Sequence, residues 1–162
     1  MKGPSTDRVS FEKYDISKLN AVGLTGFDMH YHTRYSDSFT SIHGALDLAK
    51  KKGINLAITD HNLIGGVLEA YEIRKEDDPI VVPGIEISSG DGPHILVYFH
   101  TAGELQDYWE NVLRSHIPHC PWLGINRGTE WILNSLEGRD CVVSAAHPMG
   151  YLGTIKGVER GV

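Results

Sequence analysis

The chain has 162 residues, of which 41% are hydrophobic and 22% charged, as in ordinary soluble globular proteins. A domain of this size buries about two-thirds of its surface on folding. The net charge of −6 argues against tight, non-specific binding to nucleic acid, because neutralising phosphates requires a basic surface. The sequence has neither an apolar signal segment nor a run of about 18 apolar residues that could span a membrane. With only Cys120 and Cys141 present, we expect a reducing, cytoplasmic location.

Strand-like and helix-like segments alternate along most of the chain, which is typical of α/β proteins. Residues 1–22 are polar and weakly patterned and are interpreted as an N-terminal extension, which leaves residues 23–162 as the folded domain. Strands are predicted at residues 27–32, 55–59, 80–87 and 94–99, followed by a short buried strand at 141–146. Helices are predicted at residues 42–52, 66–75, 103–115 and 130–136, with a proline-containing loop at 116–128.

The helix at residues 42–52 has the clearest local signals. Thr40 or Ser41 is suited to cap its first turn, and Gly53 is suited to end it. Its predicted buried face consists of Ile42, Ala45, Leu46 and Ala49. For the last predicted helix, Thr129 is the expected N-cap.

Five strands separated mostly by helices predict an open or closed parallel barrel. The final stretch, GYLGTIKGVERGV, contains no further strand pattern, whereas a closed barrel needs more strands. We therefore expect that the last strands of the barrel are missing from this chain and are supplied by a further segment or by a partner.

The first predicted strand carries Asp28, His30 and His32 at alternating positions. Because side chains alternate between the two faces of a strand, the two histidines share a face, with Asp28 behind them. Two imidazoles at the carboxyl end of a barrel strand form a clamp for a metal ion. Taken alone, the pair is equally well explained as ordinary hydrogen-bonded polar residues.

Further polar residues follow the next strands. Asp37 lies in the loop after the first strand and, alone, reads as an ordinary turn residue. The second strand runs into Asp60 and His61, where Asp60 is suited to cap the next helix but His61 lacks a structural explanation. Glu86 stands between two isoleucines, and a carboxylate buried there needs a partner, for which a metal ion is suited.

The last two strands carry one histidine each: His94 begins an apolar strand and His147 ends another. All five strands thus have a histidine or glutamate at or near an end, four of them at the carboxyl side. Structural histidines placed at random would not favour one rim of a sheet, so we interpret the whole set as a polynuclear metal site. The candidate ligands are His30, His32, Asp37, His61, Glu86, His94 and His147.

Imidazole and carboxylate ligands suit zinc, manganese or iron rather than the all-oxygen cage that calcium prefers. The candidate ligands exceed what one tetrahedral ion needs, so we expect two or three divalent ions. Such a site fits phosphoryl displacement by a metal-bound hydroxide.

The strings DMHYHTRYSDS, AITDHN, PGIEISS, HILVYF and SAAHPMG, in this order and spacing, resemble the motifs of PHP (polymerase and histidinol phosphatase) domains from about Gly26 to Gly150. The resemblance implies a distorted (β/α)7 TIM-like barrel with a trinuclear metal site that hydrolyses phosphate esters. It further implies that His30 and His32 hold one ion and that Asp37 and His61 belong to a second. Glu86 would bridge two ions, with His94 and His147 completing the cluster.

One departure from the family pattern concerns the carboxyl-terminal part. PHP domains end with a strand bearing a Ser-Asp-x-His type motif that supplies the last two ligands, and no such motif follows His147. We expect that an absent segment of a longer chain carries them; the alternative is that these ligands are lost.

The function that the resemblance implies is a metal-dependent phosphoesterase acting on a small phosphomonoester or nucleotide. Asp37 and His61 are the expected catalytic groups, and Arg34 is either a bidentate contact to the substrate phosphate or a surface residue. Trp109, Trp122 and Trp131 are interpreted as core or loop-anchoring residues rather than as platforms for stacking bases.

Three other functions remain as alternatives. An amidohydrolase-like C–N hydrolase also opens with two alternating histidines, but it usually carries a lysine on a middle strand, where this chain has Glu86. A non-catalytic module could bind metal or a polymerase partner without turnover. A nucleic-acid substrate is left open but not favoured, because the chain is acidic.

Overall fold

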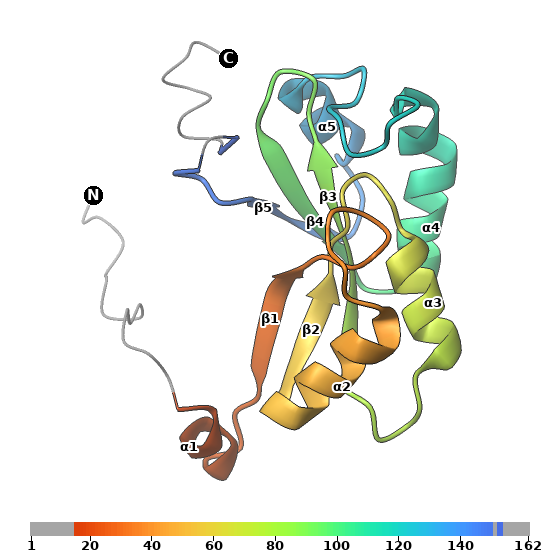
Figure 1. The fold of residues 1–162 in the computed structure, drawn as a ribbon. Coiled ribbons are helices and arrows are strands. Elements are labelled where there is room, and N and C mark those ends of the chain that lie inside the picture. Colours follow the sequence, from red (N-terminus) through yellow and green to blue (C-terminus); the bar gives the residue numbers. More distant parts are fainter. Residues whose placement is uncertain (1–14, 151, 154–162) are drawn as a thin grey trace, which may run out of the picture.

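The computed structural model describes residues 15–150, 152 and 153, which form one α/β structure of a sheet and a layer of helices (Figure 1). The elements follow in the order α1 (Ile16–Ala21), β1 (Gly26–Tyr31), α2 (Ile42–Lys52), β2 (Ile54–Ile58), α3 (Gly65–Ile73), β3 (Val81–Ser88), β4 (His94–Phe99), α4 (Ala102–Tyr108), α5 (Thr129–Ser135) and β5 (Cys141–Ala145). Helix α4 runs on through a π-helical turn (Trp109–Leu113) and a 3-10 turn (Arg114–His116). The predicted helix at residues 103–115 is therefore present as three consecutive helical pieces.

The five strands form one sheet in the order β1-β2-β3-β4-β5, so each strand pairs with its neighbour in the chain. The pairs β1–β2 and β2–β3 are parallel, whereas β3–β4 and β4–β5 are antiparallel. The prediction of a parallel sheet is therefore wrong for β4. Only residues 89–93 connect β3 to β4, and so short a connection permits a hairpin but not the crossover that parallel strands need.

The helices α2, α3 and α4 cover one face of the sheet (Figure 1). The main core lies between these layers and includes Ile58, Ile85 and Val97 from three of the strands. The predicted buried face of α2 is confirmed, as its buried residues are Ile42, Ala45, Leu46 and Ala49. Both predicted signals at its ends are present too: the Ser41 hydroxyl accepts from the amide of Gly44, and Gly53 ends the helix in the left-handed conformation.

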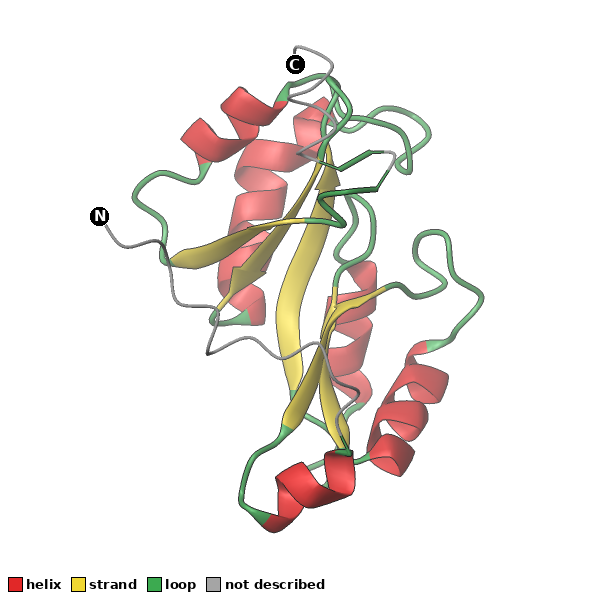
Figure 2. Cartoon of the chain, turned by 90° about the vertical axis from the view of Figure 1, so that its left-hand side faces the viewer, coloured by secondary structure: helices red, strands yellow, loops and turns green. Residues whose placement is uncertain are grey.

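The opposite face of the sheet bears no helix from the described part of the chain (Figure 2). A small second cluster of Ala57, Leu96, Tyr98 and Ala146 lies on this face. β5 at the edge is largely exposed, with Val142 and Val143 both open to solvent, so the prediction of a buried last strand is wrong. An edge strand that pairs on one side only has few side chains to bury it.

The sheet curls into a half-barrel, which fits part of the expected TIM-like barrel (Figures 1 and 2). The residues that the structure describes do not close a (β/α)7 barrel. The final residues, 154–162, and residues 1–14 of the predicted extension lie outside the described part. Residues 16–21, also within that predicted extension, form α1, which contacts β1. None of the described helices is both long and apolar enough to cross a membrane.

One prediction about a helix end needs correction. The N-cap of α5 is Gly128, not Thr129, and it makes no side-chain cap hydrogen bond. The carboxylate of Asp91, in the β3–β4 connection, instead accepts from both the amide and the hydroxyl of Thr129.

In β1 the pairing register shifts between Asp28 and Tyr31, and Asp28 lines a small cavity with residues of α2.

Candidate metal centre

The predicted ligands meet at one edge of the sheet. β1, β2, β3 and β5 run in one direction and β4 in the other, so the carboxyl ends of the four strands share an edge with the start of β4. This explains why His94 lies at the beginning of its strand whereas the other ligands follow or end theirs. The cavity at this edge has a volume of about 420 Å³ and is lined by His30, His32, Asp37, His61, Glu86, His94, His147, Gly150 and Leu152.

Glu86 is the centre of the cluster and is fully buried. Ring nitrogens of five histidines lie within hydrogen-bond or ion-pair distance of its two carboxylate oxygens. For Oε2 the distances are 3.1 Å to His30, 2.9 Å to His32 and 3.3 Å to His61, and for Oε1 they are 3.1 Å to His94 and 3.2 Å to His147. All five imidazoles therefore point at one carboxylate.

Asp37 stands at the mouth of the cavity, with 54% of its side chain exposed. Its Oδ1 lies 2.6 Å from Nδ1 of His32, and its Oδ2 lies 3.6 Å from Nε2 of His61. His32 is thus held between two carboxylates, one buried and one exposed. Sequence reasoning placed Asp37 in a loop, and the loop brings it to this cluster.

The electrostatics of the cluster follow from these contacts. Burial opposes ionisation of Glu86, but hydrogen bonds from His30, His32 and His94 outweigh it and hold the pKa of the carboxyl well below its usual range. Burial likewise opposes the charged form of His32, yet its hydrogen bonds to Glu86 and Asp37 raise its pKa to about 9. For His61 burial is the largest influence and lowers the pKa, with the neighbouring histidines acting in the same direction.

The donor set fits divalent metal ions. Three overlapping groups each place their ligand atoms within 4.8 Å of one another: His30, His32 and Glu86; His32, Asp37 and His61; and His61, Glu86 and His94. The Nε2 atoms of His30 and His32 face each other at 3.0 Å, where only one of them can donate a hydrogen. A cation among these lone pairs would satisfy the nitrogens and the buried carboxylate together, and mixed imidazole and carboxylate ligation suits zinc, manganese and iron.

A layer of hydrogen bonds behind the cluster fixes the loop that carries Asp37. Asp60 is fully buried and accepts from the amide of Thr33 at 2.7 Å, from its hydroxyl at 2.7 Å, and from the hydroxyl of Ser36 at 2.6 Å. The prediction that Asp60 caps a helix is wrong, because α3 begins only at Gly65 after the uncapped Ile64. Asp60 is also backed by Gly66, where a Cβ would come within 2.4 Å of its carboxylate.

Asn62 links the cluster to a distant loop, a role that sequence reasoning missed. Its side-chain amide donates to the carbonyls of Pro121 at 2.8 Å and Leu123 at 2.9 Å, and its side-chain oxygen accepts from the amide of Ser88 at 2.9 Å. The hydroxyl of Ser88 in turn lies 3.0 Å from Nδ1 of His61. The only available signal was the position of Asn62 directly after His61 in the string AITDHN.

Backbone strain is concentrated beside the cluster. Asn62 and His147 are the two non-glycine residues with positive φ in the described part of the chain, at 54° and 27°. One follows His61 directly and the other contacts Glu86. Such conformations cost free energy and persist where the surrounding contacts enforce them, often at functional sites.

Arg34 lies outside the group that lines this cavity. Its guanidinium binds both carboxylate oxygens of Glu69 on α3, at 3.1 and 2.9 Å, and the hydroxyl of Tyr35 donates to the same carboxylate. The predicted contact between Arg34 and a substrate phosphate stays a prediction.

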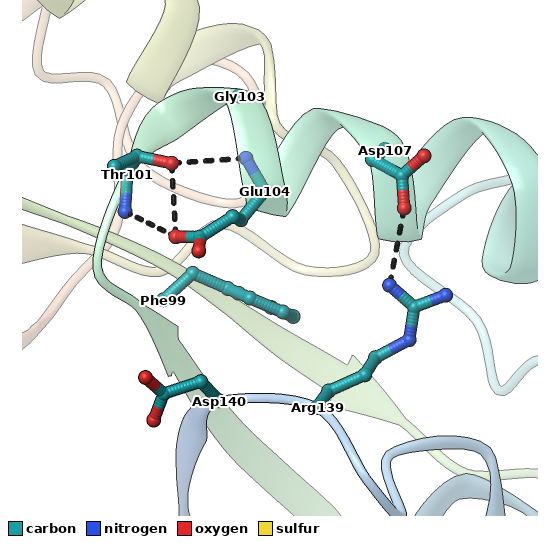
Figure 3. Close-up of a pocket in the computed structure, with 7 residues that line it drawn as sticks. All are labelled: Phe99, Thr101, Gly103, Glu104, Asp107, Arg139 and Asp140. Carbon is teal, nitrogen blue, oxygen red and sulfur yellow. Dashed lines mark hydrogen bonds and ion pairs between the residues drawn. The ribbon is translucent and has the colours of Figure 1, made fainter.

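A second polar cavity, of about 490 Å³, lies at the Phe99 end of β4 (Figure 3). Its charged groups are engaged with their own neighbours. Glu104 forms a capping box with Thr101 at the start of α4, and Asp107 pairs with Arg139 at 3.1 Å. In contrast to the first cavity, no histidine lines this one among the described residues.

Comparison with known proteins identifies the family of the chain. Residues 28–156 match the model of the PHP domain, so the chain belongs to the PHP domain family. It shares 39% identity over 85 residues with an uncharacterized protein of Methanocaldococcus jannaschii, covering 45% of this chain and 50% of that protein. It shares 36% identity over 74 residues with a 5'-3' exoribonuclease of Haemophilus influenzae, covering 43% of this chain and 27% of the enzyme.

Among solved structures, the lesion-specific endonuclease PfuEndoQ of Pyrococcus furiosus is similar in fold, with a TM-score of 0.65 at 19% identity. That match covers 82% of this chain and 37% of the endonuclease. The chain thus spans half or less of the length of these relatives. Both named enzymes are nucleases.

Proposed function

We propose that this chain is a metal-dependent phosphoesterase that hydrolyses the phosphate ester of a small phosphomonoester or nucleotide. The observation that carries the proposal is the convergence of five histidines on the buried carboxylate of Glu86, beside the exposed carboxylate of Asp37. The cavity above them, about 420 Å³, lies in the range of about 300–1,000 Å³ that is usual for small-molecule sites.

The metal ligands of the proposed centre would come from the three overlapping groups around Glu86, together with His147. Two or three divalent ions would supply positive charge for the phosphate oxygens and lower the pKa of water to the neutral range. The family's motif order supports the number of ions, and Glu86, the carboxylate that belongs to two of the groups, would be shared between two ions.

The remaining roles belong to the protein's own side chains. Asp37, exposed at the mouth, is placed to hold the proton of His32 at Nδ1 and to orient the ring of His61. His61 is kept largely neutral because burial lowers its pKa, so its free nitrogen can bind metal or accept a proton. Arg34 would have to leave Glu69 before it could contact the phosphate.

The second candidate function is cleavage of nucleic acid. It is favoured by the similarity to an exoribonuclease and to an endonuclease, and disfavoured by the net charge of −6. An amidohydrolase-like reaction has less support, because Glu86 occupies the central position on the middle strand. A non-catalytic metal-binding module would retain the cluster without turnover.

The test combines elemental analysis of the purified chain with hydrolysis of an aryl phosphate and of a 5'-phosphorylated oligonucleotide, each with added manganese or zinc. We expect two or three ions per chain and metal-dependent release of inorganic phosphate or nucleotide that a chelator abolishes. Bound metal without turnover of either substrate would favour the non-catalytic module. Absence of bound metal would overturn the assignment of the cluster.

A further inference from the structure

Trp122 is an exposed tryptophan fixed beside the candidate metal centre. The residue is 53% exposed, and the next residue, Leu123, is 61% exposed. A large apolar side chain gains free energy when it leaves water, and here two such residues adjoin each other in solvent on a well-anchored loop. The other two tryptophans are partly buried and pack against the main core.

The loop around Trp122 is held in place by several hydrogen bonds. The amide of Asn62 binds the carbonyls on both sides of Trp122, those of Pro121 and Leu123. Farther along, the amide of Ile125 donates to the carbonyl of Ser88 at 2.8 Å. Gly124 packs so closely on the segment after β3 that a Cβ there would lie 2.6 Å from the carbonyl of Ser89. The backbone beneath the indole is therefore tied to the residues next to His61 and Glu86.

The indole lines a cavity that adjoins the metal centre. This adjoining cavity, distinct from the one near Phe99, measures about 460 Å³ and includes Trp122, Leu123, Ser88 and Ser89. It shares Asp37, His61, His94 and Leu152 with the cavity over Glu86. A substrate whose phosphate lies at the metal centre would therefore extend its leaving group toward the indole.

We propose that Trp122 is a specificity-determining residue that stacks on the nucleobase of a nucleotide whose phosphate occupies the metal centre. A planar aromatic ring is the group that an exposed indole binds best, and base-on-aromatic stacking tolerates any base. This inference rests on the proposed phosphoesterase function and names its substrate class. It departs from the expectation that Trp122 only anchors a loop.

The first test compares hydrolysis of adenosine 5'-monophosphate with that of glycerol 2-phosphate by the metal-loaded chain. Trp122→Ala is expected to raise KM for the nucleotide about 10- to 100-fold with a much smaller change in kcat, and so to lower the preference for nucleotide over glycerol phosphate. Trp122→Phe is expected to retain most of that preference. Leu133→Ala, which removes an exposed apolar side chain of α5, serves as the control and leaves the preference unchanged.

The second test follows the binding of nucleotide by fluorescence instead of by product release. Adenosine 5'-monophosphate is expected to quench the tryptophan fluorescence of the zinc-loaded protein, and Trp122→Phe should remove that change while keeping the nucleotide preference. A 5'-phosphorylated dinucleotide, tested alongside, distinguishes a free nucleotide from the end of a strand as the source of the base. An unchanged substrate preference in Trp122→Ala, with both esters hydrolysed, would overturn the role of Trp122 but not the phosphoesterase. Quenching at Trp122 without hydrolysis of either ester would support stacking and count against the phosphoesterase.

Discussion

Strand β4 has a polar cavity at each end, and the two cavities have similar volumes, about 420 Å³ near His94 and about 490 Å³ near Phe99. Near Phe99 the acidic side chains contact residues that are close in the sequence or exposed on the surface. Glu104, for example, forms hydrogen bonds with Thr101 (Figure 3). Near His94 the groups come from all five strands or the loops that follow them, and they converge on one buried carboxylate. Volume alone therefore does not separate the two cavities, whereas the convergence of sequence-distant side chains on one carboxylate does.

The charged groups at the two ends of β4 also differ in what they contribute to the free energy of folding. A capping box or an exposed ion pair stabilises the helix or surface on which it lies, and removing it costs little. A buried carboxylate surrounded by five imidazoles is costly to desolvate, and its retention needs a compensating partner. A bound cation would be that partner, so changes at the two ends of β4 should differ in kind as well as in size.

The largest expected effect comes from Glu86→Gln, compared with Glu104→Gln at the other end. Glutamine keeps the shape of Glu86 but removes its charge, so we expect loss of bound metal and a fall in kcat/KM of more than about 100-fold. Glu104→Gln should retain the full metal content and activity. Elemental analysis and phosphate release measure both, and thermal unfolding in a chelator checks that each variant is folded. A full metal complement in Glu86→Gln would show that the cluster is not organised around this carboxylate.

A second comparison uses one histidine from each end, His32→Ala and His100→Ala. His32 contacts Glu86 and Asp37, whereas His100 lies on the surface and pairs with Asp140 at 3.3 Å. We expect His32→Ala to lose at least one metal ion. The ions that stay bound should bind about 10- to 100-fold more weakly, because the neighbouring ligands lose their orientation. His100→Ala should bind metal as the unaltered protein does. Equal metal content in the two variants would contradict the assignment of His32.

The local part of this structure was predictable from the sequence. Helix α2 has an N-cap, an apolar face and a terminal glycine within 13 residues, and the structure has all three where they were expected. The edge location of the cluster was also predictable, because residues such as His61 and His147 come soon after the ends of apolar strands. These features depend on residues that are close together in the sequence, and a sequence pattern shows such local relations directly.

The parts that could not be predicted depend on pairing between distant segments. The reversed direction of β4 was within reach, since residues 89–93 are too few for a crossover, but the exposure of β5 depends on which strands flank it. The hydrogen bonds of Asn62 join His61 to residues about 60 positions away, and no periodicity marks them. Asp60 was predicted to be a helix cap because its actual hydrogen-bond partners, Thr33 and Ser36, lie on the loop after β1, far from it in the sequence.

A third prediction compares two buried asparagines, Asn62→Ala beside the cluster and Asn55→Ala on β2. The Asn62 side chain makes three hydrogen bonds to backbone groups, whereas Asn55 accepts one, from the amide of Ile80. We expect Asn62→Ala to lower the free energy of unfolding by about 2–4 kcal/mol and Asn55→Ala by about 1 kcal/mol, measured by urea denaturation. Only Asn62→Ala should also raise KM for a nucleotide, because it releases the loop that carries Trp122. Equal losses of stability with unchanged KM would mean that this loop does not depend on Asn62.

The smallest effect is expected for Arg34→Ala, compared with Arg139→Ala at the far cavity. Each guanidinium pairs with one carboxylate, Glu69 for Arg34 and Asp107 for Arg139, and at least one partner of each pair is exposed, so the pairs contribute little to stability. Because Arg34 is engaged with Glu69 and does not line the cavity over Glu86, we expect both variants to keep their metal and to change kcat/KM by less than about threefold. A loss of more than about tenfold in Arg34→Ala alone, with all metal retained, would show that the guanidinium leaves Glu69 to bind the substrate phosphate. In that case Glu69→Gln, which frees the same guanidinium, should raise the affinity for substrate rather than lower it.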